Sequence, residues 1–305
     1  MNAGAELAAG LRRVRLDIAY DGTDFHGAQI QATGRTVGGE IEAALARITG
    51  ATRRLSFAGR TDRGVHAAGQ VAHVDLPAAL PDERLLRALN AVLPDDVAII
   101  AARTVPATFH ARYDARWREY RYQVWNAPTR HPALARTTWQ LRRPLDLAAL
   151  GAATTALLGV HDFAAFAGQG LGVPARPGGR STVRAILEAK WTVGSAPVPV
   201  PVPVPVGRLI EFRVRGTGFL PQMVRTIVGA AIEVGMGRQR PEWFAAIQAG
   251  RDRAAVPAPA PPQGLSLWAV GYETDARPAR GTADSDVPRE CRDGLLSGVD
   301  GPLRR

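Results

Sequence analysis

The order in which strand and helix patterns follow one another is the feature that most restricts the fold of this chain. Residues 14–20 alternate apolar and polar side chains, as a half-buried strand does, and residues 36–50 carry apolar side chains at helical spacing up to a terminating glycine. Strand patterns at 70–76 and 97–103 enclose a helix pattern rich in leucine at 85–93. The first part of the chain therefore predicts the order β-α-β-α-β.

The rest of the chain repeats this theme with longer spacings. Strand patterns and helix patterns continue in sequence: a strand at 118–125, a helix from Asp146 to Gly159, strands at 184–194 and 208–216, helices at 219–235 and 241–250, and a strand at 265–272. Hairpins mixed with helices favour an α+β fold over a doubly wound parallel sheet.

Two segments lie outside this plan. The run "APVPVPVPVPV" at 196–206 cannot donate ladder hydrogen bonds at alternate residues, so we expect an extended insertion between two strands, either a long hairpin loop or a docking motif. Residues 276–305 lack apolar periodicity, which predicts a disordered tail. The resulting domain plan is an N-terminal tail at 1–11, one half at 12–115, a second half at 116–275 with the insertion, and the C-terminal tail.

The charge of the chain favours an anionic partner. Its formal net charge is +10, and Lys190 is the single lysine among 38 basic residues. A positive surface raises the rate of encounter with nucleic acid, and guanidinium groups bind phosphate in a bidentate manner. The alternative is a basic, soluble surface without a nucleic-acid partner, produced in part by drift in composition.

The single cysteine, Cys291, excludes a disulfide framework and a cysteine-rich metal site. His66 and His73 have no neighbours at metal-ligand spacing, so no metal is expected. The chain contains no secretory signal pattern, and no apolar run approaches the ~20 residues of a membrane span. These features predict a cytoplasmic protein with no membrane contact.

The stretch "SFAGRTDRGVHAAGQV" at 56–71 holds the strongest candidate for chemistry. Gly59 and Gly64 permit a tight exposed turn, and Asp62 lies near its tip beside Arg60. An adjacent guanidinium lowers the pKa of a carboxyl group by ~1 to 3 units, which would keep Asp62 ionised as a nucleophile or base. The alternative is a turn aspartate that caps backbone amides and forms a surface ion pair with Arg60.

The motif "GRTDRGVHA" closely resembles the signature of the pseudouridine synthases that act on the tRNA anticodon arm, the TruA family. Six further blocks resemble family blocks in family order: "YDGT" (20–23), "FHARYDA" (109–115), "EYRYQVWN" (119–126), "LLGVHDFAAF" (157–166), "GFLPQMVRTIVG" (218–229) and "GLSLWAVGY" (264–272). The resemblance covers residues 12–273. A stretch of nine residues can match by chance, but seven blocks in order do not.

The resemblance implies conversion of uridine to pseudouridine in tRNA without a metal, redox cofactor or energy source. It implies that Asp62 is the catalytic aspartate, that Tyr120 packs on the target uracil and that Arg225 pairs with Asp62. From the residues alone, Tyr120 could equally be sheet core, and Arg225 could face solvent at the edge of an apolar helix stripe. Whether Asp62 attacks the sugar, attacks the base or removes a ribose proton stays open.

Further residues match family positions with weaker signals. Arg60 resembles an active-site arginine, with a simple salt bridge to Asp62 as the alternative. The remaining candidate substrate contacts are Phe109, His110, Ala111, Arg112, Tyr113, Arg180 and Arg184. For Arg180 and Arg184, a solvated basic loop is the competing interpretation. Four departures from the family pattern, at Ala28, Ile30, Gly38 and Arg63, put local packing and RNA affinity in question more than the reaction.

The resemblance also implies an architecture and an assembly. Family members have two ferredoxin-like halves whose mainly antiparallel sheets join around a central basic cleft, and they act on tRNA as homodimers. The implied targets are uridines of the anticodon stem-loop at tRNA positions 38–40. A non-catalytic RNA-binding protein on the same scaffold is the alternative function.

Overall fold

The structure is a computed structural model that describes residues 10–168, 181–194 and 207–273. The described residues up to Tyr272 form one compact unit. The expected Pro-Val insertion and C-terminal tail, together with Arg180, lie outside the described residues.

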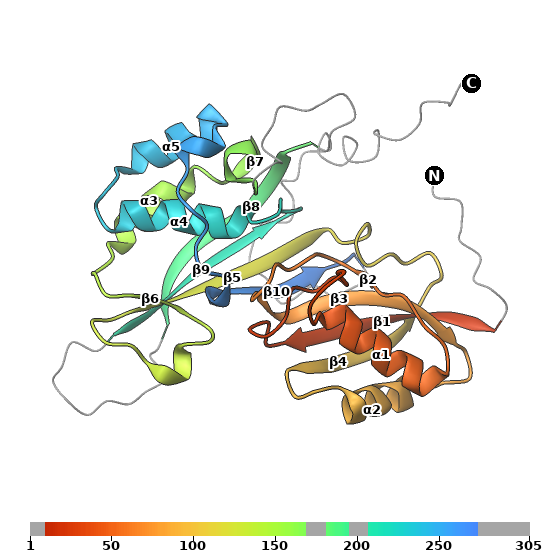
Figure 1. Cartoon of the computed structure of the whole chain (residues 1–305). Coiled ribbons are helices and arrows are strands. Elements are labelled where there is room, and N and C mark those ends of the chain that lie inside the picture. The colour runs from red at the N-terminus through yellow and green to blue at the C-terminus, as the bar shows by residue number, and fades with distance from the viewer. Residues whose placement is uncertain (1–9, 169–180, 195–206, 274–305) are drawn as a thin grey trace, which may run out of the picture. The chain divides into compact units, whose positions relative to one another are not determined.

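The N-terminal region, residues Leu11–Val105, contains the predicted alternation of strands and helices (Figure 1). Its elements are β1 (Leu11–Tyr20), α1 (Val37–Thr49), β2 (Ser56–Phe57), β3 (His66–Pro77), α2 (Asp82–Val92) and β4 (Val97–Val105). The Thr36 side chain caps α1 by accepting a hydrogen bond from the amide of Gly39, and Gly50 ends the helix in the left-handed conformation. The sequence did not predict β2.

The C-terminal region, residues Trp117–Tyr272, contains three α-helices and six strands among its described residues. The strands are β5 (Trp117–Asn126), β6 (Trp139–Leu141), β7 (Gly159–Asp162), β8 (Val183–Gly194), β9 (Arg208–Gly216) and β10 (Leu265–Gly271). The helices are α3 (Leu147–Thr155), α4 (Met223–Gly235) and α5 (Pro241–Gly250). Four 3₁₀ turns complete the C-terminal region: η1 (Pro132–Leu134), η2 (Ala164–Phe166), η3 (Arg253–Ala255) and η4 (Pro262–Gly264).

Two predicted helix boundaries were wrong. The helix expected from Asp146 to Gly159 ends at Thr155, and Gly159 opens β7 with a φ of 98°. The helix expected from residue 219 begins only at Met223, because Gln222 takes a left-handed φ of 59° directly after Pro221. Phe219 therefore lies in the loop before α4 and not on its apolar stripe.

The strands of the described residues form one ten-stranded sheet of order β4-β1-β3-β10-β5-β9-β8-β7, with β2 paired to β3 and β6 paired to β5. The pairings are antiparallel except β10 with β3 and β5 with β6. The last strand in sequence, β10, thus joins the strands of the N-terminal region to those of the C-terminal region. The predicted α+β class with a mainly antiparallel sheet is confirmed.

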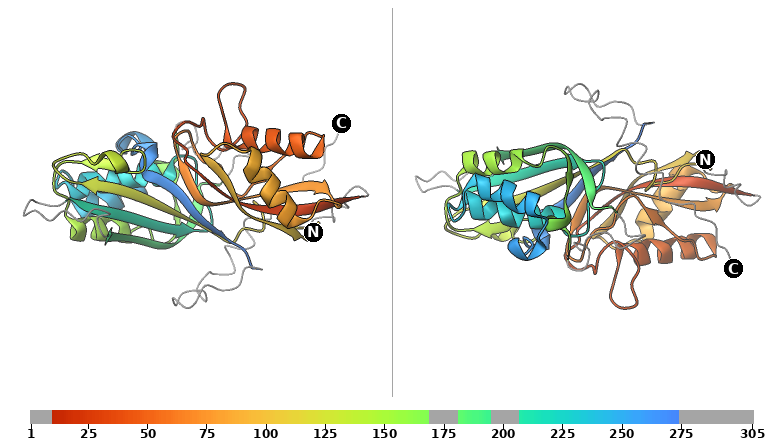
Figure 2. Two further views of the ribbon diagram at one scale, coloured as in Figure 1. Left: turned by 90° about the horizontal axis from the view of Figure 1, so that it is seen from below. Right: turned by 90° about the horizontal axis from the view of Figure 1, so that it is seen from above.

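The helices of each region cover the strands of that region. Figure 1 and the two views of Figure 2 show α1 and α2 against the strands of the N-terminal region and α3, α4 and α5 against those of the C-terminal region. The apolar faces that meet in these layers form one continuous core, which includes Leu16 and Ile41 in the N-terminal region and Phe212 and Ile227 in the C-terminal region. No helix of the described residues is long and apolar enough to cross a membrane.

Candidate active site

The loop that carries Asp62 connects β2 to β3 at residues 58–65. It turns at Gly64, whose φ of 75° strains any residue with a Cβ, and the amide of Val65 donates to the carbonyl of Asp62 at 3.1 Å. The amide of Ala58 donates to the carbonyl of Val71 at 2.7 Å and fixes the start of the loop on β3. Asp62 is thereby presented on a short, tightly turned segment.

The segment between β1 and α1, residues 21–36, packs against the backbone of this loop. An ideal Cβ on Gly22 would lie 2.0 Å from the carbonyl oxygen of Val65, so only glycine permits this approach. The amide of Ala28 donates to the carbonyl of Thr61 at 3.2 Å, and Ala28 is fully buried. The departure at position 28 is therefore a packing feature beside the candidate catalytic loop.

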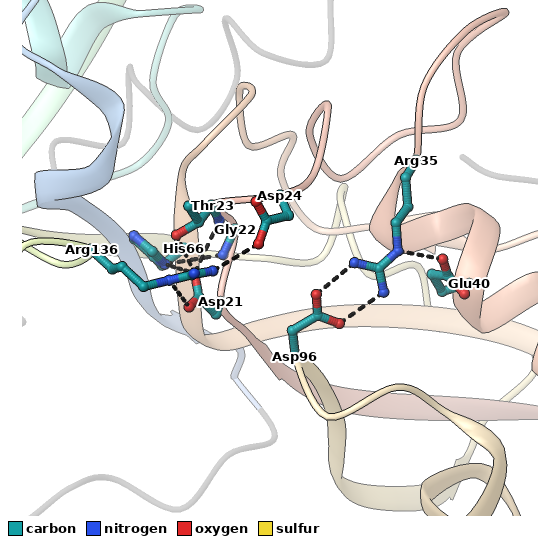
Figure 3. A network of polar contacts seen from close by, with 9 residues as sticks. All are labelled: Asp21, Gly22, Thr23, Asp24, Arg35, Glu40, His66, Asp96 and Arg136. Atoms are coloured by element: carbon teal, nitrogen blue, oxygen red, sulfur yellow. Dashed lines mark hydrogen bonds and ion pairs between the residues drawn. The ribbon is translucent and has the colours of Figure 1, made fainter.

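A polar network ties the same segment to its surroundings (Figure 3). Arg136, between η1 and β6, donates to Asp21 at 3.1 Å and to Asp24 at 2.8 Å. Arg35 donates to both oxygens of Asp96, at 2.6 and 2.9 Å. The network connects the segment both to the C-terminal region and to the residues just before β4.

Asp62 meets Arg225 from the other region. Arg225 lies in the first turn of α4, and its guanidinium Nη1 is 3.7 Å from Oδ2 of Asp62. The Nε of Arg225 donates to the carbonyl of Ala260 at 2.7 Å, which fixes its orientation. The structure therefore brings together the two groups that the resemblance pairs, whereas Arg60 is exposed.

Burial raises the pKa of Asp62 above that of an ordinary aspartate, and the positive charge of Arg225 offsets part of the rise. The expectation that a neighbouring guanidinium would leave this pKa lowered was wrong, because the carboxyl group loses more solvation than the arginine restores. The side chain of Asp62 is still 37% exposed, so it remains open to a reactant.

Tyr120 lies next to the Asp62 loop on the face of β5 that packs under α4. Its ring meets that of Phe219 edge to face, with centroids 5.1 Å apart, and an ideal Cβ on Gly59 would be 3.8 Å from its hydroxyl oxygen. Burial raises the pKa of Tyr120 well above its usual range, so the phenol stays protonated. Phe219 was missed as a site residue because its spacing matched the helix stripe.

Arg118 is a second residue that sequence reasoning missed. Arg118 lies two positions before Tyr120 on β5. Its guanidinium donates to four carbonyls: Ala58 at 2.9 Å, Thr217 at 3.0 Å, Arg112 at 2.7 Å and Ala115 at 3.5 Å. These carbonyls belong to the Asp62 loop, the loop before α4 and the segment before β5. Burial lowers the pKa of Arg118 from its usual value. The signal in the sequence that could have found Arg118 was a basic residue two positions before Tyr120, and therefore on the same face of the predicted strand.

Arg184 and Arg112 lie near Arg118. Arg184, at the start of β8, packs beside Gly218, and its pKa is lowered by burial and by the charges of Arg112 and Arg118. We call these three residues the arginine cluster. Among residues 10–168, 181–194 and 207–273, none of the three pairs with a carboxylate.

The segment at 109–113 divides into buried and exposed members. Phe109 and Ala111 are buried, with the Phe109 ring 5.2 Å from that of Tyr272, so their side chains pack in the core. His110 is partly exposed, and Arg112 and Tyr113 are exposed, Tyr113 to 69%. RNA contact by this segment stays a prediction, and the exposed side chains are the ones that could make it.

Comparison with known proteins identifies relatives over most of the chain. A family model described as tRNA pseudouridine synthase matches residues 18–114 and 153–273. A protein of Solidesulfovibrio magneticus is 43% identical over 267 residues, covering 86% of this chain and 92% of its own length. Proteins of Roseiflexus castenholzii (43% identity, covering 89% and 95%) and Geobacillus kaustophilus (40%, covering 87% and 96%) are similar. All three are named tRNA pseudouridine synthase A.

Proposed function

The chain belongs to the tRNA pseudouridine synthase family, and from this premise we propose that it isomerises uridine to pseudouridine in the anticodon stem-loop of tRNA, at positions 38–40. The reaction breaks the bond between N1 of uracil and C1′ of ribose and forms a bond between C5 and C1′. Atoms are conserved, so the enzyme is an isomerase.

One observation carries the proposal: the carboxylate of Asp62 meets the guanidinium of Arg225 at 3.7 Å, beside the ring of Tyr120. The reaction requires an ionised carboxylate that either bonds to the nucleoside or removes a ribose proton. Arg225 favours the ionised form against the effect of burial. Activity should therefore rise with pH as Asp62 ionises.

The target uridine must leave the base stack before it reaches Asp62, at a cost of a few kcal/mol. Stacking of a base on an aromatic ring contributes ~1 to 3 kcal/mol and can offset much of that cost. Tyr120, whose ring packs edge to face on Phe219, lies beside the Asp62 loop and is proposed to contact the uracil. The Tyr120 phenol stays neutral over the working pH range.

The arginine cluster supports RNA binding near the same site. Arg112, Arg118 and Arg184 gather without a carboxylate partner in the described part of the chain, and burial together with mutual repulsion makes the charged forms of Arg118 and Arg184 costly. An RNA phosphate would relieve that cost by charge-assisted hydrogen bonds. We propose that the cluster and the predicted contacts Arg60, His110 and Tyr113 line a basic cleft for the tRNA.

The finer architecture proposed for this function is a pair of ferredoxin-like halves. In the first half, the elements follow along the chain as β1-α1-β2-β3-α2-β4, and the strands lie in the sheet in the order β4-β1-β3-β2. In the second half, the corresponding elements follow as β5-α3-β8-β9-α4-β10, and the strands lie in the order β10-β5-β9-β8. Both follow the split β-α-β arrangement of that fold. We also propose that the protein is a homodimer and acts in the cytoplasm. Sedimentation of the purified protein tests the dimer.

The decisive experiment incubates the full chain with unmodified tRNA transcript and maps pseudouridine at single-nucleotide resolution. The wild type should form product at positions 38–40. Asp62→Asn should form at least about 10³-fold less because it removes the reacting charge, while its affinity for tRNA stays within about threefold of wild type. Binding without product by the wild type would instead favour a non-catalytic RNA-binding protein.

A further inference from the structure

We propose that Tyr20, Thr61 and Gln70 form a chain of hydrogen-bonded side chains that positions Asp62 for the reaction. The inference rests on the proposed function, since it concerns how the same aspartate is held. None of the three residues is exposed to the reactant, so each acts through the loop and not on the nucleoside.

The chain runs from β3 through β1 to the residue before Asp62. The hydroxyls of Tyr20 and Thr61 share a hydrogen bond of 2.8 Å. The amide Nε2 of Gln70 donates to the carbonyl of Gly59 at 2.8 Å and lies 3.5 Å from the Tyr20 hydroxyl. The loop is thereby held at Gly59 and at Thr61, on the N-terminal side of Asp62.

All three side chains are withdrawn from solvent. Tyr20 is 5% exposed, Thr61 6% and Gln70 0%, and the Oε1 of Gln70 accepts a hydrogen bond from the amide of Val71 at 3.1 Å. A buried hydroxyl or amide is costly unless it is hydrogen-bonded. Each member is therefore held by its hydrogen bonds, and these bonds restrain the loop.

The carboxylate itself is weakly held. Its described ion-pair partner, Arg225, is 3.7 Å away, beyond the length of an ordinary hydrogen bond. The position of the carboxylate must therefore be set by the backbone of residues 59–64. The amide of Gly64 donates to the carbonyl of Phe25 at 3.2 Å and fixes the other end. Tyr20 and Gln70 supply the side-chain hydrogen bonds on the near end.

A positioning role and a proton-transfer role lead to different pH behaviour. Burial raises the pKa of Tyr20 to about 12, so its hydroxyl stays protonated across the pH range of an assay. Loss of this hydroxyl should lower the rate of the chemical step by the same factor at every pH. A displacement of about 1 Å at a reacting group costs on the order of 10²-fold in rate, so we expect a loss of about 10- to 100-fold.

The experiment measures single-turnover rate and tRNA affinity of the full chain on an unmodified transcript between pH 6 and 9. Tyr20→Phe and Thr61→Val should each lose about 10- to 100-fold in rate with affinity unchanged within about twofold. Thr61→Ser, which keeps the hydroxyl, should recover most of the rate. The double variant Tyr20→Phe with Thr61→Val should lose no more than the worse single variant, because both break one chain.

The matched control is Thr154→Val, which removes a buried hydroxyl that donates to the carbonyl of Leu150 within α3. Its rate should equal that of wild type. Thermal denaturation of every variant checks folding, and should Tyr20→Phe fail to fold, the comparison of Thr61→Val with Thr61→Ser decides alone. Multiplicative losses in the double variant, or a full rate in Thr61→Val, would overturn the inference. A wild type without product would instead overturn the proposed function, and this inference with it.

Discussion

The loop 58–65 and the strand β5 contribute to one site by different physical means. The loop supplies a carboxylate whose place depends on backbone hydrogen bonds and on a buried polar chain. The strand supplies Tyr120 and Arg118 from one face of a central sheet position, flanked by β10 and β9. The comparison suggests that the reactive group is placed by a few hydrogen bonds to a short loop, whereas recognition and support are built on a central strand of the sheet.

Removing Arg225 should produce the largest effect that tests this division. Arg225→Met leaves Asp62 partly buried without its cation, so the pKa of Asp62, already raised by burial, should rise further. Because the ionised form is needed, the acid limb of the pH–rate profile should move to higher pH. The maximal rate should fall by about 10²- to 10³-fold, since a charge at the reacting centre is lost.

The measurement is the single-turnover rate from pH 5 to 9, with Arg225→Lys as the matched variant. Lysine keeps the charge, so its acid limb should stay near that of wild type even if its rate is reduced. An unmoved acid limb in Arg225→Met would mean that the ion pair has no influence on Asp62.

Removing Arg118 should mainly affect stability. Arg118→Met leaves the carbonyls of Ala58, Thr217 and Arg112 without their donor. Unsatisfied buried groups cost ~1 to 3 kcal/mol each, so the free energy of unfolding should fall by about 3 kcal/mol, after allowance for those that reach water. Denaturant unfolding measures the change.

The control lies on the same strand and the opposite face. Arg121 pairs with Glu119 at 3.1 Å, but Glu119 keeps a second partner in Arg213 at 2.8 Å. Arg121→Met should therefore cost no more than about 1 kcal/mol. Equal losses in the two variants would contradict the supporting role of Arg118.

The sequence predicts the strands with regular alternation and the motif that contains Asp62, because both depend on local pattern. It does not predict β2, β6 or β7, which span two to four residues and are too short for a periodic signal. The late start of α4 depends on the left-handed backbone of Gln222. That conformation is unfavourable for a residue with a side chain, so propensity points the other way.

The site residues likewise divide into those that a local motif reveals and those that it does not. Asp62 and Arg225 are found from their motifs, although 163 positions separate them, and the structure brings them together. Arg118 is invisible to motif reasoning because its partners are backbone carbonyls, one of them 99 positions away. The direction of the Asp62 pKa could not be predicted either, since desolvation depends on how closely the folded chain surrounds the carboxyl group.

Neutralising Arg112 or Arg184 of the arginine cluster should have a smaller effect, and it should fall on tRNA binding. Arg112→Gln and Arg184→Gln should each weaken tRNA binding by about three- to tenfold and reduce the slope of log K against log salt by roughly 0.7 to 0.9, as expected for one phosphate contact. Filter binding between 50 and 300 mM salt measures the slope. Arg238→Gln is the control: Arg238 lies just beyond the C-terminal end of α4 and pairs with Glu233, so the slope should stay unchanged. Unchanged slopes in all three variants would contradict phosphate binding by the cluster.

The smallest expected effect is a gain in stability from losing the reactive group. The folded-state pKa of Asp62 is raised above its unfolded value, so ionisation of this group destabilises the fold as pH rises through the folded pKa. The amide side chain that Asp62→Asn introduces does not ionise. At pH 7 this variant should unfold about 1 to 3 °C above wild type, whereas at pH 3, below both pKa values, the two proteins should unfold at the same temperature.

The control on strand β5 is Tyr120→Phe. The phenol that it removes is neutral at both pH values, so the difference in unfolding temperature from wild type should be the same at pH 3 and pH 7. A pH-independent difference for Asp62→Asn would mean that the loop does not strain the carboxylate, and the contrast between a reactive loop and a supporting strand would then have no energetic basis.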